Sequence, residues 1–297
     1  MTTRHHMARG FTLIEMMVSL ATGLLVVLSA GALLHQAHAV YLDLDDAALV
    51  QETGRLSLSH LRTVLSQANH LPWERALQST SPVLRTGGLR GLDDRRNAAA
   101  LDPQKNNFDA GTERGINQSD ILMIGFFGSP DVGHVASCGS GAITSKRGDG
   151  NAGSDGRRSW VIYFIRQTGN NEPELHCRYH NAKGGIGKDA VASGIESMQV
   201  LYGVDSDTVN GADRWYSASQ MTPALWRRVR LVRIALLVRG RHFNDRGGAA
   251  HSFDLLGPGP QTVSIATDKH PPRLRAVFET TVMLRNAVPM PGPGEPR

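Results

Sequence analysis

An uninterrupted apolar segment near the start of the chain sets the strongest limit on how this sequence can fold. It runs from Phe11 to Leu34, and Glu15 is its only ionisable residue. A helix of this length extends about 36 Å at 1.5 Å per residue, whereas the hydrocarbon core of a bilayer is roughly 30 Å thick. The segment therefore predicts one membrane-spanning helix, and the rest of the fold has to be built after it.

The charges on either side of this segment predict its orientation. Arg4 and Arg9 precede it, and three aspartates follow it between positions 43 and 46. By the positive-inside rule the short N-terminus stays in the cytoplasm and the rest of the chain is exported. Three interpretations remain open: an uncleaved signal anchor, a secretory signal peptide cut after Ala39, and a short leader cut after Gly10. The apolar run is longer than the segment of about 7–15 residues that is typical of a signal peptide.

Glu15 helps to separate these interpretations. A carboxylate in a spanning helix costs on the order of 3 kcal/mol at the bilayer centre and less near the end, and a signal peptide gains nothing from it. If a peptidase cuts after Gly10, Phe11 carries a free ammonium group that Glu15 of a neighbouring subunit can pair with. At about 4 Å such a pair attracts by about 4 kcal/mol at an effective dielectric near 20. The alternative is a side chain that extends to the headgroups at the end of the helix.

The residues around this glutamate resemble the cleavage motif of type IV prepilins, Gly10-Phe11-Thr12-Leu13-Ile14-Glu15 before an apolar run. In that family a prepilin peptidase cuts after the glycine and methylates the new N-terminal phenylalanine, and the glutamate supports assembly. The resemblance implies cleavage between Gly10 and Phe11, N-methylation of Phe11 and an assembly role for Glu15. Residues 1–10 are then a leader and residues 11–34 a transmembrane and assembly helix. The proline that often kinks this helix in major pilins is missing, and Gly23 and Gly31 are its only helix breakers.

Helical periodicity continues beyond the apolar segment. Leu42, Leu49 and Leu56 are spaced by seven residues, and the opposite face is polar. The pattern predicts an exported amphipathic helix over 35–70, continuous with the spanning segment to about Asn69 and ended by Pro72. Such a helix should pack on a globular head.

Residues 71–287 predict a β-rich periplasmic head. The polar residues 73–118 indicate a long connection with little regular structure, and 139–159 indicate a Gly-rich loop. Apolar and alternating runs predict strands over 120–127, 160–166, 174–179, 195–202, 229–239 and 275–284. One long helix followed by mostly antiparallel strands is an α+β, pilin-like fold. The Pro/Gly-rich residues 288–297 predict a disordered tail.

Later segments of the chain resemble the PilW family of type IV minor pilins. They are "SGIESMQVLYGVDSD" (193–207), "WRRVRLVRIALLVRGR" (226–241) and "RLRAVFETTVMLRN" (273–286), with "QETGRLSLSHLRTVLSQA" (51–68) resembling the family's exported helix. The resemblance departs over 70–118 and 139–158. It implies a subunit of the bacterial inner membrane whose head lies in the periplasm and which enters the pilus on assembly. The implied partners are the prepilin peptidase, other minor pilins, the major pilin and, at the fibre tip, an adhesin.

The two cysteines, Cys138 and Cys177, are candidates for a disulfide because the head is expected outside the reducing cytosol. A bridge would close a loop of about 40 residues and stabilise the fold by roughly 3–4 kcal/mol on the chain-entropy model. Two buried free thiols are the alternative.

Other motifs in the head are weak. Asp205, Asp207 and Asp213 resemble a calcium loop only loosely and fit an acidic turn between strands as well. His176 and His180 share one face of a predicted strand, but Cys177 points to the other, so no complete metal site is visible. The cluster Arg227, Arg228, Arg230 and Arg233 lacks the interleaved aromatic residues of single-strand binding, and the net charge of +5 is modest; binding to nucleic acid is not expected.

No constellation of nucleophile, base or paired carboxylates is visible, so we expect neither an enzyme nor a cofactor. The function we expect is that of a minor pilin that primes or caps the type IV pilus. A pseudopilin of a type II secretion system, in the J-type position, has the same N-terminal pattern and is the first alternative. The second is a periplasmic domain that binds a ligand or DNA, with its signal anchor cleaved or retained.

Overall fold

The computed structural model describes residues 10–70, 87–105, 107–126, 138, 159–180, 186–206, 211–243, 252–257, 262–264 and 273–286. The chain divides into two compact units, Met1–Asp46 and Ala47–Arg297. Helix α1 (Leu13–Leu65) begins in the first unit and ends in the second. The predicted leader up to Arg9, the predicted loop 139–159 apart from Ser159, and the predicted tail 288–297 lie outside the described residues.

The first unit contains the apolar part of α1. By length and composition, α1 is the one described helix that can cross a membrane, and the side chains of its apolar stretch are exposed. Three hydroxyl groups in this stretch donate to carbonyl oxygens one turn earlier in the same helix: Ser19 to Met16, Thr22 to Val18 and Ser29 to Leu25. Since polar groups need partners inside the segment when they enter lipid, the sequence of this helix is compatible with a bilayer.

In the second unit, the C-terminal part of α1 packs into the head. Leu61, Val64 and Leu65 are fully buried in a core shared with both main sheets. The helix ends at Leu65, earlier than the predicted end near Asn69. Asn69 takes a left-handed conformation at φ 60°, which asparagine tolerates better than most residues. Its backbone N–H donates to the carbonyl of Gly125 at 3.0 Å, and its side-chain oxygen accepts from the N–H of Gly88.

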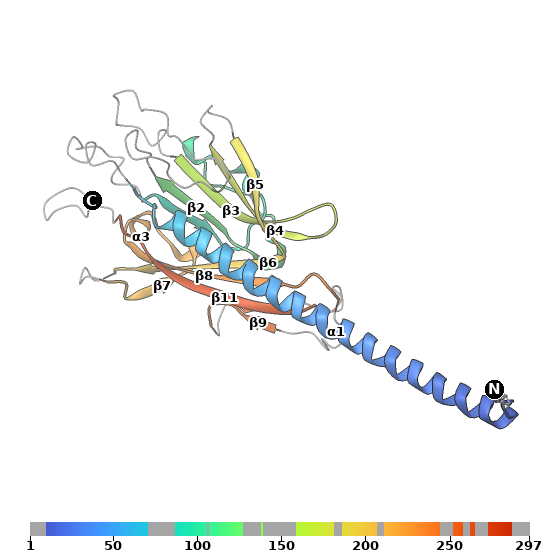
Figure 1. The fold of residues 1–297 in the computed structure, drawn as a ribbon. Coiled ribbons are helices and arrows are strands. Elements are labelled where there is room, and N and C mark those ends of the chain that lie inside the picture. Colours follow the sequence, from blue (N-terminus) through green and yellow to red (C-terminus); the bar gives the residue numbers. More distant parts are fainter. Residues whose placement is uncertain are drawn as a thin grey trace, which may run out of the picture. The chain divides into compact units, whose positions relative to one another are not determined.

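A five-stranded antiparallel sheet forms the first half of the head. Its strands follow chain order: β1 (Leu89–Leu92), β2 (Ile121–Phe126), β3 (Ser159–Gln167), β4 (Pro173–His180) and β5 (Ile186–Ser193). Figure 1 labels β2 to β5. Strand β3 is buried on both faces because its residues alternate between two cores. Val161, Tyr163 and Ile165 join the core beneath α1, and Trp160, Ile162 and Phe164 join a second core with the segment around Ala98 and Leu101.

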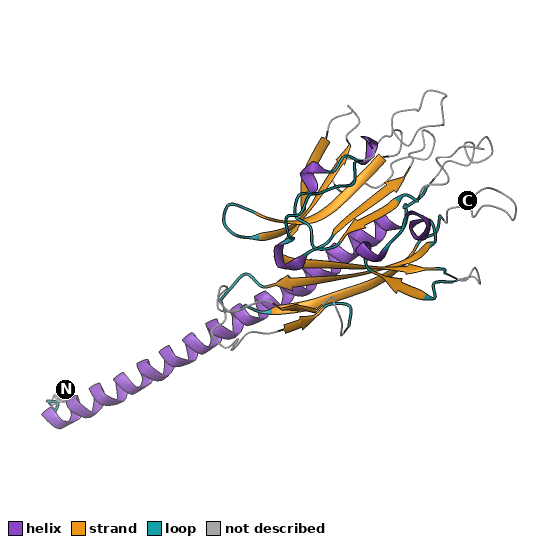
Figure 2. Ribbon diagram, turned by 180° about the vertical axis from the view of Figure 1, so that it is seen from behind, coloured by secondary structure: helices purple, strands orange, loops and turns teal. Residues whose placement is uncertain are grey.

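A four-stranded antiparallel sheet forms the second half, in the order β11-β8-β6-β7. Figure 2 shows the strands of the head on both sides of the C-terminal part of the helix. These strands are β6 (Ile195–Val204), β7 (Arg214–Tyr216), β8 (Val229–Arg239) and β11 (Arg275–Met283). Two further strands, β9 (Ser252–Asp254) and β10 (Thr262–Ser264), pair with each other. One short helix, α3, covers Pro223–Trp226. The described chain also contains 3-10 turns at Ala98–Ala100, Pro103–Lys105, Ile116–Gln118 and Ala218–Gln220. The α+β prediction is confirmed.

Asp120 joins the two sheets at the start of β2. Its backbone N–H donates to Met198 O at 2.9 Å, and its carboxylate accepts the N–H groups of Val200 at 2.8 Å and Asp94 at 3.0 Å. Burial raises the pKa of this carboxyl well above its usual range, with a further contribution from the charge of Asp93. A buried carboxyl therefore ties β2 of one sheet to β6 of the other.

The prediction of little regular structure over 73–118 was wrong at 89–92, where β1 pairs with β2 in register from Leu89 opposite Ile124 to Leu92 opposite Ile121. A strand this short carries no readable periodicity, and it forms because β2 offers it a buried edge. Strands β5 and β7 were also not predicted. By contrast, the runs expected over 120–127, 160–166, 174–179, 195–202, 229–239 and 275–284 coincide with β2, β3, β4, β6, β8 and β11.

Candidate functional site

The segment Gly10–Glu15 contains the expected processing site, and it forms a capping box at the start of α1. The Thr12 hydroxyl accepts the backbone N–H of Glu15 at 3.3 Å, and the Glu15 carboxylate accepts the backbone N–H of Thr12 at 3.1 Å. The Thr12 hydroxyl also donates to the same carboxylate oxygen at 3.2 Å. These bonds satisfy donors that every helix leaves open at its N-terminus.

The capping box fixes where the helix begins. Gly10 and Phe11 lie before Leu13 and outside α1, and the Phe11 side chain is 85% exposed. The peptide bond between Gly10 and Phe11 is therefore presented in non-helical, exposed chain directly before the apolar helix. The sequence carries the signature of this cap, Thr-x-x-Glu before an apolar run, but capping was not among the two roles expected for Glu15, pairing with another subunit and extension to the headgroups.

Within the described residues, both hydrogen bonds that the Glu15 carboxylate accepts from Thr12 end on one oxygen, Oε2. A carboxylate has about four lone-pair sites, so the second oxygen, Oε1, can accept further donors. The local cap and a pairing with an ammonium group are therefore chemically compatible.

The PilW-like motifs of the head meet in a buried ion network. Glu196 is only 2% exposed and receives Arg275 through two bonds, Nε to Oε2 at 2.7 Å and Nη2 to Oε1 at 3.0 Å. Arg239 donates to Glu196 Oε1 at 3.3 Å and to Glu172 Oε2 at 2.7 Å. The network connects β6, β8 and β11 with the turn before β4. Its residue types match structural pairing of buried charges rather than catalysis.

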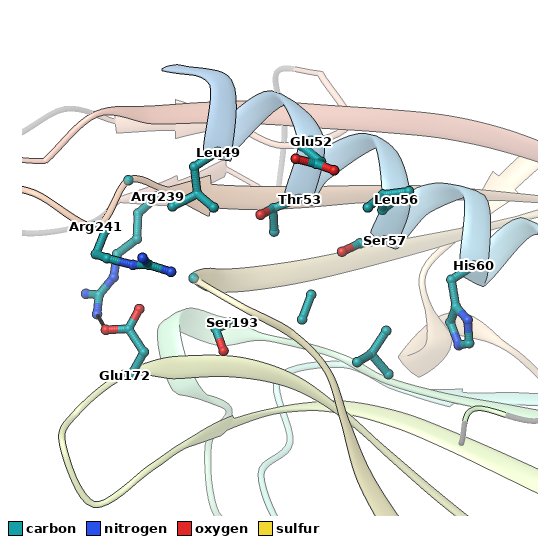
Figure 3. A pocket seen from close by; sticks show the side chains of 14 residues that line it. Leu49, Glu52, Thr53, Leu56, Ser57, His60, Glu172, Ser193, Arg239 and Arg241 are labelled. Carbon is teal, nitrogen blue, oxygen red and sulfur yellow. Dashed lines mark hydrogen bonds and ion pairs between the residues drawn. The ribbon is translucent and has the colours of Figure 1, made fainter. Parts of the chain in front are cut away.

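A cavity of about 450 Å³ lies beside this network, between α1, the end of β5 and the end of β8 (Figure 3). Figure 3 shows Thr53 and Ser57 of the helix above Ser193, with Arg239 paired to Glu172 at one end and His60 at the other. The Ser57 hydroxyl is buried without a hydrogen-bond partner among the described residues. The charged groups around the cavity balance, since Glu52 and Glu172 face Arg239 and Arg241. The cavity therefore has both polar and apolar walls and no preference for either charge.

His60 closes one end of that cavity. Its Nε2 lies 2.9 Å from the hydroxyl of Tyr163, and the two rings meet edge to face. Burial lowers the pKa of His60 below its usual value of 6.5, and burial raises the pKa of Tyr163. Both groups are therefore neutral near pH 7 and form an uncharged hydrogen bond between α1 and β3.

Cys138 and Cys177 are joined in a disulfide, with their Cα atoms 5.9 Å apart. Cys177 lies in the core beneath α1, whereas the neighbouring His176 packs on Phe164 at the other face and binds Glu174 Oε2 at 2.9 Å. The side chain of His180 lies outside the described residues. Across the part of the chain that the structure describes, no group of three His, Cys, Asp or Glu side chains is arranged to hold a metal ion.

The calcium candidates do not converge on one point within the described residues. Asp213 accepts the backbone N–H of Ser206 at 2.6 Å and its hydroxyl, and these bonds lower the pKa of Asp213. Asp205 is buried, with its carboxylate 3.6 Å from Arg230 Nε. Asp207 lies outside the described residues. Asp205 and Asp213 act here as anchors of a turn between β6 and β7.

Three of the clustered arginines interact with the protein itself. Arg228 donates to Ser206 O at 3.0 Å, Arg230 lies beside Asp205, and Arg233 binds both carboxylate oxygens of Glu279 at 2.9 and 3.1 Å. Arg227 lies next to them at the end of α3. The cluster therefore has structural partners across β8 and β11.

Comparison with protein families gives one match in the head. Residues 162–286, which are less than half of the chain, match the family model of PilW, described as type IV pilus-assembly protein W. The resemblance to PilW is confirmed. The PilW segment extends from within β3 to the end of the described chain and includes Glu196, Arg239 and Arg275. The buried network therefore lies within the part of the chain that matches the PilW model.

Comparison with curated proteins finds no match. Among solved structures, the chain is similar to a type IV-like pilin from Thermus thermophilus, with 13% sequence identity and a TM-score of 0.42. That similarity covers 80% of this chain and 98% of the pilin.

Proposed function

We propose that the chain is a minor pilin that primes or caps a type IV pilus after a prepilin peptidase removes residues 1–10. The observation that carries this proposal is the exposed Gly10–Phe11 peptide, held outside α1 by the capping box and followed directly by an apolar helix. The PilW segment of the head supports the assignment to pilus assembly rather than to an unrelated membrane anchor. The role is structural and involves no catalysis.

Glu15 would act twice in this scheme. Before cleavage it caps its own helix through Oε2. After cleavage, the methylated ammonium of Phe11 from a neighbouring subunit pairs with Oε1 and sets the register of adjacent helices. The apolar helix anchors the subunit in the inner membrane with its head in the periplasm, as the flanking charges predict. Other minor pilins, the major pilin and a tip adhesin are the partners that follow from this role.

Intact-mass analysis of protein extracted from its native membrane tests the cleavage. The expected mass lacks Met1–Gly10 and carries one added methyl group on Phe11. Protein that retains the leader, or that begins at Val40, would overturn the proposal.

Substitution of Glu15 tests the assembly role. Glu15→Ala should still be cleaved but should enter sheared pili at least about tenfold less well, because a pairing energy of 1.4 kcal/mol already corresponds to a factor of ten. Glu52→Ala removes an exposed glutamate elsewhere on the same helix and should assemble normally.

A deletion strain that keeps its pili but loses protein secretion would instead identify a type II pseudopilin.

A further inference from the structure

A second cavity, of about 420 Å³, lies on the face of the five-stranded sheet opposite to the one that packs on α1. Its floor comes from Phe164–Gln167 of β3, Arg178 of β4 and Lys188 of β5, and its wall from residues 96–99 with Glu113. The register places Arg178 opposite Ile162 and Lys188 opposite Arg178, so these side chains share the face of the second core. Neither the buried ion network nor the N-terminal segment takes part in this cavity.

The wall of the cavity is fixed to the sheet by specific contacts. Arg178 Nη1 donates to Ala98 O at 2.8 Å and to Leu101 O at 2.5 Å. Further along the same segment, Phe108 packs edge to face on Trp160, with ring centroids 5.8 Å apart. These contacts hold the segment in one position, so the cavity exists before any ligand arrives.

The charge of this cavity is strongly one-sided. Four cations line it, Arg96, Arg166, Arg178 and Lys188, against one carboxylate, Glu113. In the described part of the chain, Arg96, Arg166 and Lys188 make no ion pair, and Arg178 donates only to neutral carbonyls.

The strand register adds to this imbalance. It sets Arg178 directly against Lys188, and like charges in opposed positions destabilise a sheet. Glu174 stands opposite Arg166, but it is already bonded to His176 at 2.9 Å and to Ser193 at 3.0 Å. An anion in the cavity would relieve the repulsion that the register creates.

We propose that this cavity binds a small hydroxylated anion, with a carboxylate or phosphate group beside hydroxyl groups, as in an acidic sugar. Guanidinium groups pair with carboxylate and phosphate groups through two parallel N–H···O bonds. The amide of Asn97 also lines the cavity and offers both donors and an acceptor to hydroxyl groups. The volume lies within the range of about 300–1,000 Å³ that is typical of small-ligand sites. The inference goes beyond a role in pilus assembly and does not depend on it.

Calorimetric titration of the full chain in a non-ionic detergent tests the proposal, with glucuronate, glucose 6-phosphate and glucose as probes. Either anionic sugar, or both, should bind, and the stronger of the two shows whether a carboxylate or a phosphate is preferred. Glucose should bind at least about tenfold more weakly. Salt should weaken the binding of the anionic sugars, because Arg166 and Lys188 are exposed to solvent. Equal binding of glucose, or no binding of either anionic sugar, would overturn the proposal.

A double variant locates the site. Arg166→Gln with Lys188→Gln removes two exposed cations of the cavity and should weaken the anionic sugar by about tenfold or more. Arg62→Gln removes an exposed arginine that does not line the cavity and should leave the affinity unchanged. A hexaglutamate peptide that binds more tightly than either sugar would show a protein partner instead, and full affinity in the double variant would place the binding elsewhere.

Discussion

At the residue scale, Glu196 is a buried charge that links strands by pairing with two arginines. Its two carboxylate oxygens hold Arg275 and Arg239, and all three side chains are buried. Desolvation of such a group is expensive, so the network is stable only while every member keeps its partner. The consequence is an uneven response to substitution, because loss of one charge leaves the others buried and unpaired.

We expect Glu196→Ala to lower the free energy of unfolding by about 3–5 kcal/mol. The substitution leaves Arg275 buried without a carboxylate partner, and Arg239 keeps only Glu172. Urea unfolding of the detergent-solubilised chain measures this loss. The matched control is Glu279→Ala, which breaks the more exposed pair with Arg233 and should cost less than about 1 kcal/mol. Equal losses in the two variants would contradict the structural role of the network.

His60 predicts a pH dependence of stability. Its pKa is lowered in the folded protein, so between that pKa and the usual value of 6.5 the unfolded chain binds more protons than the folded one. The contribution of His60 to the free energy of unfolding is therefore complete above about pH 6.5. It declines as the pH falls towards the pKa of His60 in the folded protein, by at most about 1.4 kcal/mol per pH unit. Unfolding midpoints between pH 7.5 and 5.5 should fall less in His60→Gln than in the parent. An identical decline in both proteins would exclude His60 as the titrating group.

At this scale the sequence reveals local roles better than distant ones. The pair Thr12 and Glu15 is three residues apart, so its capping geometry can be derived from spacing alone. Arg239 and Arg275 lie 43 and 79 residues from Glu196, and nothing in the spacing predicts that they meet. The cationic cavity was missed for the same reason, since its residues come from three strands and a covering segment.

At the scale of elements, strands with a strong apolar pattern were predicted and the others were not. Strand β8 is apolar over most of its length, and its boundaries agree with the prediction. Strand β5 reads Ile-Gly-Lys-Asp-Ala-Val-Ala-Ser, which has low strand propensity, and it forms because β4 supplies a pairing partner. The end of α1 was predicted too late because the bonds of Asn69 to Gly88 and Gly125 depend on the sheet.

The contact between α1 and β11 depends on Gly54. A Cβ atom there would overlap the ring of Phe278, so a larger residue fits only if this ring moves away from the helix. We expect Gly54→Leu to destabilise the fold by about 1–3 kcal/mol through overpacking, even though leucine favours helix. Thermal unfolding measures the change, and Arg55→Leu, on the exposed side of the same turn, is the control. If both variants gain stability, the close approach is not a constraint.

At the scale of the whole molecule, links between residues far apart in the sequence help to hold the head together. Asp120 bridges β2 to β6, and the disulfide fixes Cys138 to β4 across 39 residues. The α+β class could be predicted from the order of helix and strands. The division into two sheets could not, because it depends on which strands pair rather than on where they occur.

Removal of the disulfide should weaken the molecule as a whole. Cys138→Ala with Cys177→Ala is expected to lower the free energy of unfolding by roughly 3–4 kcal/mol, because the unfolded chain regains the freedom of a long loop. Denaturant unfolding with and without a reductant measures the loss. The reductant should destabilise the parent and leave the double variant unchanged, and a parent insensitive to reduction would contradict the stabilising role.

The far end of α1 is fastened to three separate parts of the head. Asn69 is bonded to Gly88 and Gly125, and the Asn286 amide, directly after β11, donates to the carbonyl of Ala68 at 3.1 Å and of Ser66 at 3.5 Å. A mechanical load drawn along the helix is thus divided among β1, β2 and β11. Because the load is shared, no single strand carries it alone, and we expect the helix to separate from the head less readily than it would through one attachment.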